Sequence, residues 1–317
     1  MRLVLAVLAT FSLALGRTHL VRPGETLYSI ARRYGTTVEE LARINGIEDP
    51  SRILAGSRLV IPEGPGWPED WGLSVEPYPL VQGRPSWVRL EGVRWVELSG
   101  VRARLYRGLG LLPVPATLSP GSHPLLLADG RRARALVVSG GYATRHLTLP
   151  REKRGLLDPG EIRRERERIL AACGKAPPEP LFRPGEPWRW PVPDPVVSAP
   201  FGERRTYDGR PGGYHAGMDL AAEAGTPVLA PAPGRVALAE EFPVRGLTVV
   251  IAHGLGVCSV LQHLSEMAVS PGEEVAPGDP VGAVGSSGLS TGPHLHFEVR
   301  VLGIPQDPMF FLEGPGR

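Results

Sequence analysis

The sequence has few of the residues from which several kinds of site are built. Only two cysteines, Cys173 and Cys258, occur in 317 residues, and no CxxC spacing is present, so cysteine cannot build a metal site. No HExxH motif occurs either, which removes the glutamate base that many metalloproteases use. The two cysteines could pair in an oxidising compartment, but we expect both to be small buried residues without a bridge.

The net charge is small and the apolar stretches are short. The net charge of +2 argues neither for nor against a polyanionic partner. The mixed arginine and glutamate run at 161–168 is typical of a solvated helix face, so we expect no nucleic-acid partner. No stretch after residue 16 approaches transmembrane length, and we expect no membrane span once a leader has been removed.

The first residues have the pattern of a signal peptide. Arg2 precedes an apolar run from Leu3 to Leu15, and Ala14-Leu-Gly16 is a small-residue cleavage signature. The apolar run is too short to span a bilayer comfortably, which favours cleavage over an uncleaved anchor. We predict a signal peptide at 1–16 and a secreted protein of the periplasm, cell envelope or cell wall.

Two short motifs near the C-terminus, HxxxD and HxH, are the most informative part of the chain. A catalytic zinc needs about three nitrogen or oxygen donors and one open position for water, and His215, Asp219 and His296 can supply them. Apolar and polar residues alternate over 294–301, so His294 and His296 share one strand face. A lone HxH is often only a solvated face, but its combination with HxxxD favours a metal site.

Further segments accompany these motifs in order over about Val196 to Leu312. They are Phe201-Gly-Glu-Arg204, His215-x-Gly-Met-Asp219, Gly225-Thr-Pro-Val228, Gly234-Arg-Val236, His263-Leu-Ser265 and Gly285-Ser-Ser-Gly-Leu-Ser-Thr-Gly-Pro-His-Leu-His-Phe-Glu298. This series resembles the lysostaphin/LytM-type zinc metallopeptidases. The resemblance implies an antiparallel β-sheet with a groove for peptidoglycan peptides. It also implies one zinc ion on His215, Asp219 and His296, with His263 and His294 as the catalytic pair.

The chemistry that follows depends on imidazoles. Zinc makes a bound water reactive near neutral pH, and without an HExxH glutamate, His263 or His294 must take the proton and pass it to the leaving amine. One of them, as imidazolium, could also stabilise the oxyanion; the sequence does not assign the two steps. Relatives commonly carry a tyrosine two residues before the third histidine, where this chain has Leu261, which puts a phenolic hydrogen bond in doubt.

Other polar residues have weaker signals. Glu298 lies on the face of His296 and is either a partner that fixes the imidazole tautomer or a plain solvated residue. His253 ends an apolar strand and is expected to be structural. The remaining histidines lack ligand spacing: His19, His123 and His146.

Residues 17–62 have the pattern of a tiny α+β module. The expected elements are a strand at 19–22, helices at 27–34 and 37–45, and a strand at 58–62. With Val21-x-Pro-Gly-Glu-Thr-Leu-x-Ser-Ile-Ala31, this order resembles a LysM module, which implies binding to peptidoglycan or another N-acetylglucosamine-containing glycan. The implied contacts lie in two loops and include Gly24, Glu25, Thr26, Ile47 and Ser51.

The rest of the chain is divided by composition. Short β-type runs at 72–150, separated by glycine, proline and serine, predict a middle β-sandwich-like domain. We predict a linker at 63–71, a helix and proline-rich connector at 151–195, and a zinc metallopeptidase domain at 196–317. The fold class is therefore mainly β and multidomain: a small α+β module, the β-sandwich-like domain and a C-terminal antiparallel β-sheet.

The sequence predicts a secreted zinc endopeptidase that hydrolyses peptide cross-links of bacterial peptidoglycan and is held on the wall by its LysM module. The expected cofactor is one Zn²⁺ per chain, and the expected partners are glycan strands and stem peptides. A non-catalytic LytM-type activator of cell-wall amidases is the alternative. Such proteins have usually lost metal ligands, so the presence of all five positions favours the enzyme.

Overall fold

The computed structural model describes residues 18–34, 36–61, 67–147, 158–207 and 210–314. It divides into two units, Met1–Gly64 and Pro65–Arg317, and each is described by itself. The predicted signal peptide at 1–16 and the first part of the predicted linker at 63–71 lie outside the described residues. None of the helices in these ranges has the length and apolar character needed to cross a membrane.

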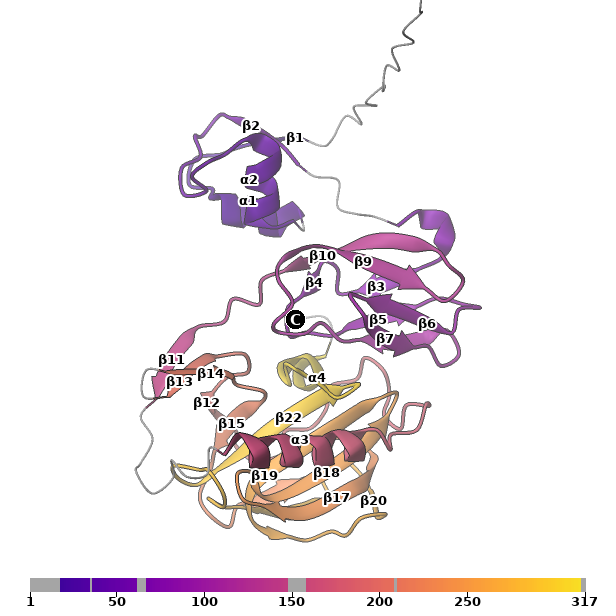
Figure 1. Ribbon diagram of the computed structural model, residues 1–317, viewed down its shortest axis with the longest axis vertical. Coiled ribbons are helices and arrows are strands. Elements are labelled where there is room, and N and C mark those ends of the chain that lie inside the picture. The colour runs from indigo at the N-terminus through magenta and orange to yellow at the C-terminus, as the bar shows by residue number, and fades with distance from the viewer. Residues whose placement is uncertain (1–17, 35, 62–66, 148–157, 208–209, 315–317) are drawn as a thin grey trace, which may run out of the picture. The chain divides into compact units, whose positions relative to one another are not determined.

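The first unit is a small α+β module (Figure 1). Strand β1 (Thr18–Leu20) pairs antiparallel with β2 (Arg58–Val60), and the helices α1 (Leu27–Tyr34) and α2 (Val38–Asn45) come between them in the chain. Leu27, Ile30 and Ala31 of α1 are buried because they recur at helical spacing on the face that meets the core. The predicted order of strand, helix, helix and strand is confirmed.

The second unit begins with two sheets around a shared apolar core, which confirms a β-sandwich-like part. Alternating residues of both sheets, such as Val75, Val96 and Leu125, are buried in this core. One sheet contains β3 (Ser74–Glu76), β5 (Ser86–Arg89) and β8 (Leu109–Leu112), after a short 3₁₀ helix η1 (Glu69–Trp71). The other contains β4 (Leu80–Val81), β6 (Trp95–Leu98), β7 (Val101–Arg104), β9 (Gly121–Leu127) and β10 (Arg132–Val138).

The C-terminal part is a large antiparallel sheet, as predicted, with the strand order β12-β15-β22-β19-β18-β17-β20. Its central strands are apolar on both faces because a large core covers one face and a smaller core covers the other. The strands are β12 (Val196–Ala199), β15 (Met218–Ala221), β16 (Pro227–Leu229), β17 (Gly234–Phe242), β18 (Gly246–Gly254), β19 (Val257–Met267), β20 (Glu274–Val275), β21 (Pro280–Val284), β22 (His294–Val301) and β23 (Ile304–Gln306), and the helix α4 (Met309–Glu313) follows them.

Helix α3 (Pro159–Cys173) covers the smaller core, where it packs on β17 and β18 (Figure 1). Asp158 caps its first turn by accepting a hydrogen bond from the Glu161 backbone N–H at 2.8 Å. Ile169 and Ala172 face the sheet and are fully or almost fully buried. The helix starts and ends where its cap residue and Gly174 predict.

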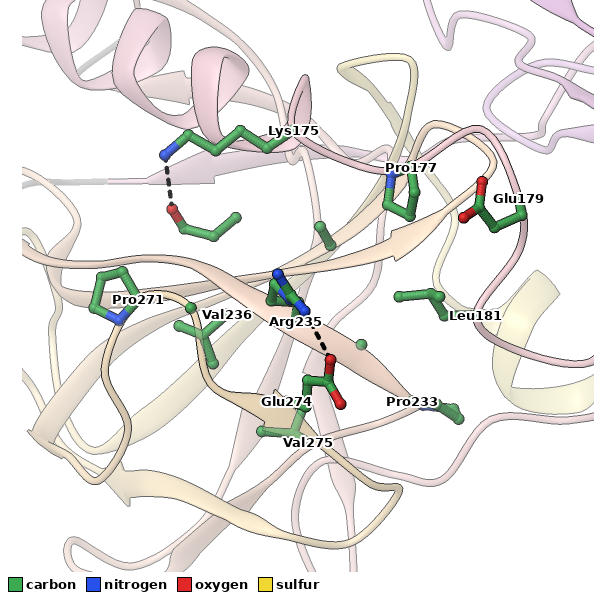
Figure 2. Close-up of a pocket in the computed structure, with 14 residues that line it drawn as sticks. Lys175, Pro177, Glu179, Leu181, Pro233, Arg235, Val236, Pro271, Glu274 and Val275 are labelled. Atoms are coloured by element: carbon green, nitrogen blue, oxygen red, sulfur yellow. Dashed lines mark hydrogen bonds and ion pairs between the residues drawn. The ribbon is translucent and has the colours of Figure 1, made fainter.

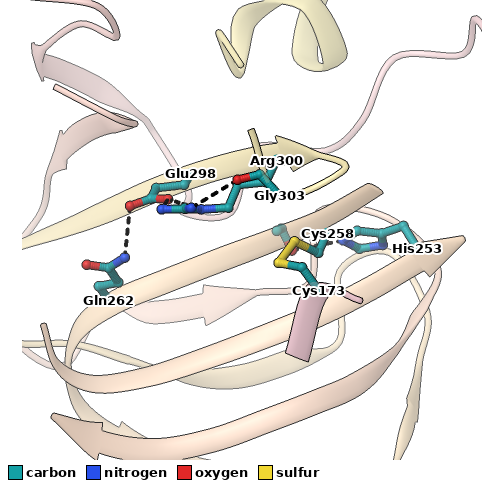
Figure 3. The surroundings of a disulfide bond; sticks show 8 residues. Cys173, His253, Cys258, Gln262, Glu298, Arg300 and Gly303 are labelled. Atoms are coloured by element: carbon teal, nitrogen blue, oxygen red, sulfur yellow. Dashed lines mark hydrogen bonds and ion pairs between the residues drawn. A yellow bond between two sulfur atoms is a disulfide. The ribbon is translucent and has the colours of Figure 1, made fainter. Parts of the chain in front are cut away.

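The expectation that the two cysteines form no bridge is wrong. Cys173, the last residue of α3, and Cys258 of β19 form a disulfide with a Cα–Cα distance of 5.4 Å (Figure 3). The bridge closes a loop over a sequence separation of 85 residues. Both residues are buried, as expected, but α3 crosses the sheet so that its end meets β19, which the sequence does not show.

A separate three-stranded sheet stands beside β12. It contains β11 (Thr144–Leu147), β13 (Arg204–Tyr207) and β14 (Arg210–Tyr214), and β11 pairs with β13 in parallel. β11 lies in the segment predicted as the middle domain, yet its partner belongs to the C-terminal part. Contacts between the two parts accompany this pairing, including an edge-to-face contact of the Tyr142 and Phe201 rings with centroids 5.8 Å apart and an ion pair between Arg84 and Asp307 at 3.1 Å.

Candidate metal centre

Strand pairing brings the HxxxD and HxH motifs together. β15 and β22 are antiparallel neighbours, and their register places Asp219 directly opposite His296. His215, four residues before Asp219, reaches the same point. Asp219 Oδ1 lies 2.7 Å from His296 Nδ1 and 3.0 Å from His215 Nε2, and the two ring nitrogens are 3.1 Å apart. Within the described residues, no other group of three potential metal ligands converges in this way.

Hydrogen bonds on the far side of each ring fix which nitrogen faces this point. His215 Nδ1 donates to the Pro200 carbonyl oxygen at 2.8 Å, which leaves the Nε2 lone pair directed toward Asp219. His296 Nε2 donates to Glu298 Oε1 at 3.2 Å, which leaves Nδ1 on the same side. Such outer partners set imidazole tautomers in metal sites, and both rings have one.

The structure resolves the two alternatives for Glu298 in favour of a partner of His296. Glu298 is 2% exposed, and Gln262 Nε2 donates to its Oε1 at 3.1 Å while Arg300 Nε donates to its Oε2 at 2.6 Å (Figure 3). Burial alone would raise the pKa of Glu298, but the Arg300 charge and the His296 hydrogen bond hold that pKa well below its ordinary value. The carboxylate is therefore ionised and accepts the His296 N–H.

His263 and His294 lie beside the ligand cluster, with ring centroids 5.0 Å apart. His263 Nδ1 donates to the Ser287 carbonyl oxygen at 2.8 Å, and His294 Nδ1 donates to the Gly292 carbonyl oxygen at 2.8 Å. Each ring therefore keeps Nε2 as an acceptor, and that of His294 lies 3.8 Å from Asp219 Oδ1. His263 also has a backbone φ of 64°, a left-handed conformation that costs free energy for a non-glycine residue.

The pKa values of the cluster follow from burial and neighbouring charges. Burial lowers the pKa of His263 to about 3, helped by the rings of His296 and His294. Burial also lowers the pKa of His215. For His296 burial acts in the same direction, but the hydrogen bonds with Asp219 and Glu298 outweigh it and raise the pKa to about 9. The Asp219 pKa is lowered by the two imidazoles against the effect of its burial.

Arg205 is a site residue that the sequence motifs did not indicate. Its Nη2 donates to Asp219 Oδ2 at 3.2 Å, so one carboxylate oxygen faces the imidazoles and the other faces a guanidinium. Arg205 directly follows the Phe201-Gly-Glu-Arg204 motif, and this adjacency was the only signal in the sequence. A cavity of about 580 Å³ contains all of these groups together with Arg145, Tyr214 and the loop at 289–293.

Two further cavities of the second unit lie away from this cluster. One, of about 750 Å³, is lined by Lys175, Arg235 and Glu274 among others, and Figure 2 shows the Arg235–Glu274 ion pair at 2.7 Å. The other, of about 1030 Å³, lies where the turn at 302–303 approaches β6 and β7. Neither is lined by any of the five predicted metal-site and catalytic residues, so the histidine cavity is the candidate active site.

The remaining predicted residues have definite places. His253 is fully buried and uses both ring nitrogens, one on the Pro233 carbonyl and one on the Ser259 hydroxyl, which is a structural role. Leu261 is buried in the large core and brings no polar group to the cavity.

Among the predicted glycan contacts in the first unit, Glu25 has an evident role in the fold. It accepts hydrogen bonds from the Arg22 backbone N–H at 2.9 Å and from His19 at 2.7 Å, which lower its pKa to about 2. Gly24 lies in the adjoining turn with φ of 83°, and the Thr26 hydroxyl caps α1 by accepting from the Ser29 N–H. Contact of a glycan with these residues, and with Ile47 and Ser51, stays a prediction.

The donor set fits a divalent metal ion. Two imidazole nitrogens and one carboxylate oxygen lie within 4.8 Å of one another, and each imidazole has an outer hydrogen-bond partner of the kind found in metal sites. Residues 213–308 match the model of peptidase family M23, and residues 19–62 match the LysM domain. The C-terminal domain belongs to peptidase family M23. The N-terminal module is a LysM domain, so both resemblances seen in the sequence are confirmed.

Curated relatives of this chain include proteins named as an enzyme and as an activator. It is 41% identical over 113 residues to the DD-carboxypeptidase/endopeptidase Mpg of Neisseria meningitidis, covering 36% of this chain and 26% of that protein. It is 38% identical over 123 residues to the murein hydrolase activator EnvC of Escherichia coli, covering 39% and 28%. The chain thus spans about a quarter of the length of these curated relatives.

A solved structure supports the fold beyond the C-terminal sheet. A Pseudomonas aeruginosa protein assigned to peptidase M23 superposes on this chain with a TM-score of 0.56 at 28% identity. The superposition covers 76% of this chain and 97% of that chain. This extent is more than the M23 match of residues 213–308 alone, so the likeness includes part of the chain outside the M23 match.

Proposed function

We propose that this M23 protein is a secreted zinc endopeptidase that hydrolyses peptide cross-links of bacterial peptidoglycan, and that its LysM module holds it on the wall. One observation carries the proposal. His215, His296, His263 and His294 all line one cavity with Asp219, and each ring holds one nitrogen on a backbone carbonyl or on Glu298, which leaves its other nitrogen for a metal or a proton. A scaffold that only binds glycan has no need of four oriented imidazoles in one cavity with a carboxylate.

The geometry suggests a separate chemical role for each of these residues. Zinc held by His215, Asp219 and His296 would polarise the scissile carbonyl and activate a water near neutral pH. Because burial keeps His263 neutral, its Nε2 is available to accept a proton. His263 and His294 together take the proton that the attacking water loses and deliver it to the leaving amine, which restores both rings. The buried Glu298 and the Pro200 carbonyl keep the ligand rings in place during this exchange.

An activator of cell-wall amidases is the second candidate, because EnvC is named a murein hydrolase activator and shares 38% identity with this chain. An activator needs a binding surface but no oriented proton acceptors. The complete ligand set and the His263–His294 pair therefore favour the enzyme. The two functions differ in whether the purified protein alone releases peptides.

Digestion of purified sacculi tests the proposal. The zinc-loaded chain alone should release muropeptides in which mass spectrometry finds an opened peptide cross-link and intact glycan bonds. Release that requires an added amidase, and yields products cut at the amidase bond, would establish the activator instead. Treatment with a chelator should stop the reaction, and added zinc should restore it.

The LysM domain should contribute binding and not chemistry. Removing residues 17–62 should weaken binding to insoluble sacculi by about 100-fold, because tethering raises the effective concentration of the catalytic domain at the wall. Cleavage of a small soluble cross-linked peptide should not change, since the first unit has its own core. Pelleting assays and peptide kinetics on both forms check this. If the two forms pelleted equally with sacculi, the LysM module would have a role other than binding the wall.

Metal affinity should rise with pH, because His296 must lose a proton to bind zinc. Without metal, its pKa of about 9 keeps the ring protonated at neutral pH, whereas His215 with its lowered pKa is already neutral. We expect about one proton released per zinc and an affinity that increases about tenfold per pH unit from about pH 6 to about pH 8. Calorimetry in buffers of different ionisation enthalpy measures both quantities. A pH-independent affinity would contradict this role of His296.

A further inference from the structure

Two arginine side chains stand side by side at one end of the catalytic cavity. β11 pairs in parallel with β13, as Figure 1 shows, and the register places Arg145 opposite Arg205. Both side chains line the cavity. Like charges directly opposite each other on neighbouring strands destabilise the pairing, so this arrangement needs negative charge close by.

Glu203 supplies part of that charge. Its Oε2 lies 3.6 Å from Arg145 Nη1 and 3.8 Å from Arg205 Nη2, which are ion-pair contacts longer than hydrogen bonds. Asp219 Oδ2 accepts a hydrogen bond from Arg205, but Oδ1 of the same carboxylate belongs to the metal site. The Glu203 carboxylate is therefore shared by the two arginines. The Asp219 carboxylate is shared between Arg205 and the metal site.

Both guanidinium groups retain donors that have no acceptor among the described residues. The side chain of Arg145 is 46% exposed, and its one hydrogen bond goes from Nη1 to the Ser198 carbonyl at 3.3 Å, so Nε and Nη2 have no acceptor among the described residues. Arg205 Nε is buried and also has no acceptor there. A buried donor without an acceptor costs free energy. On the half-exposed Arg145, a planar carboxylate from a ligand matches the free fork, while the largely buried Arg205 adds its positive charge beside it.

We propose that Arg145 and Arg205 form a subsite for a carboxylate of the substrate, so that the enzyme selects acidic peptides over uncharged ones. This inference rests on the proposed peptidase function and names its substrate class. Because Arg205 contacts Asp219, the subsite adjoins the metal ligands, and the carboxylate belongs to a residue near the bond that is cut. β11 lies outside the M23 match at 213–308, so part of this specificity comes from a segment beyond the family domain.

The test uses two soluble cross-linked peptides that differ only in whether the carboxylate beside the scissile bond is free or amidated. We expect the zinc-loaded full chain to prefer the free acid about 10- to 100-fold in kcat/KM. Arg145→Gln should remove this preference, because it raises KM for the free acid far more than it changes KM for the amide. Arg145→Lys should keep part of it, because the charge stays but the fork is lost. Arg132→Gln is a matched control on β10, where Arg132 is exposed and outside the cavity.

Binding of both peptides to His294→Ala, measured by calorimetry, gives a readout that does not depend on turnover. Equal cleavage of the two peptides by the wild type, or an equal loss on both in Arg145→Gln, overturns the subsite and leaves the peptidase function intact. If His294→Ala binds the free acid preferentially but the wild type cleaves neither peptide, the subsite is supported and the proposed function is overturned. A chain that neither prefers the acid nor cleaves contradicts both.

Discussion

Replacing His296 with alanine should remove bound metal and peptide hydrolysis together. His296 supplies one of only three protein donors, and its Nδ1 is 2.7 Å from Asp219 Oδ1 and 3.1 Å from His215 Nε2. Without it, two donors remain, one short of the number that catalytic zinc sites use. We expect zinc affinity to fall by more than about 100-fold, since loss of an outer partner alone costs about 10- to 100-fold. Metal analysis after dialysis and hydrolysis of a soluble cross-linked peptide measure the two losses.

Two further variants show whether the loss is specific. Glu298→Gln keeps every ligand but weakens the acceptor that orients His296, so it should lower zinc affinity by about 10- to 100-fold and be rescued by excess zinc. His123→Ala alters a histidine of β9 that bonds Ser99 and the Ser119 carbonyl, far from the ligand strands in sequence, and should change neither quantity. Full activity of His296→Ala, or of the metal-free wild type, would end the zinc-peptidase proposal.

The sequence was sufficient for the parts of the site that depend on residue type and local spacing. The HxxxD and HxH motifs contain His215, Asp219 and His296, and the pairing of β15 with β22 brings these side chains together. The short helix α1 was likewise predicted from apolar spacing, and a helix was predicted within 151–195, where α3 lies. In each case a few neighbouring residues contain the whole signal, because the strand or helix period fixes which side chains share a face.

The parts that the sequence did not predict depend on contacts between distant segments. The disulfide requires the end of α3 to meet β19, 85 residues away. Arg145 reaches the cavity because β11 pairs with β13 and not with the middle sheets. Glu298 could not be assigned because alternation along β22 gives its face but not what covers that face. Each depends on long-range packing, for which a single sequence carries no periodic signal.

Replacing His263 or His294 with alanine should abolish hydrolysis while zinc stays bound. Neither ring belongs to the ligand set, and each holds its Nδ1 on a backbone carbonyl with Nε2 left to accept a proton. Loss of a proton-transfer group typically lowers the rate by about 10²- to 10⁴-fold. Zinc content should remain near one per chain. The same peptide assay and metal analysis that test His296→Ala separate this class of residue from the ligands.

The double variant adds information on how the two rings act. If His263 and His294 share one proton-transfer step, removing both should cost little more than removing either, because groups that act as a unit are strongly non-additive. Their 5.0 Å centroid separation and common cavity favour this outcome. Multiplicative losses would instead assign them separate steps, with one ring accepting the proton and the other stabilising the oxyanion. Zinc loss in either single variant would show that the ring is a ligand, and the division into three ligands and two catalytic residues would be wrong.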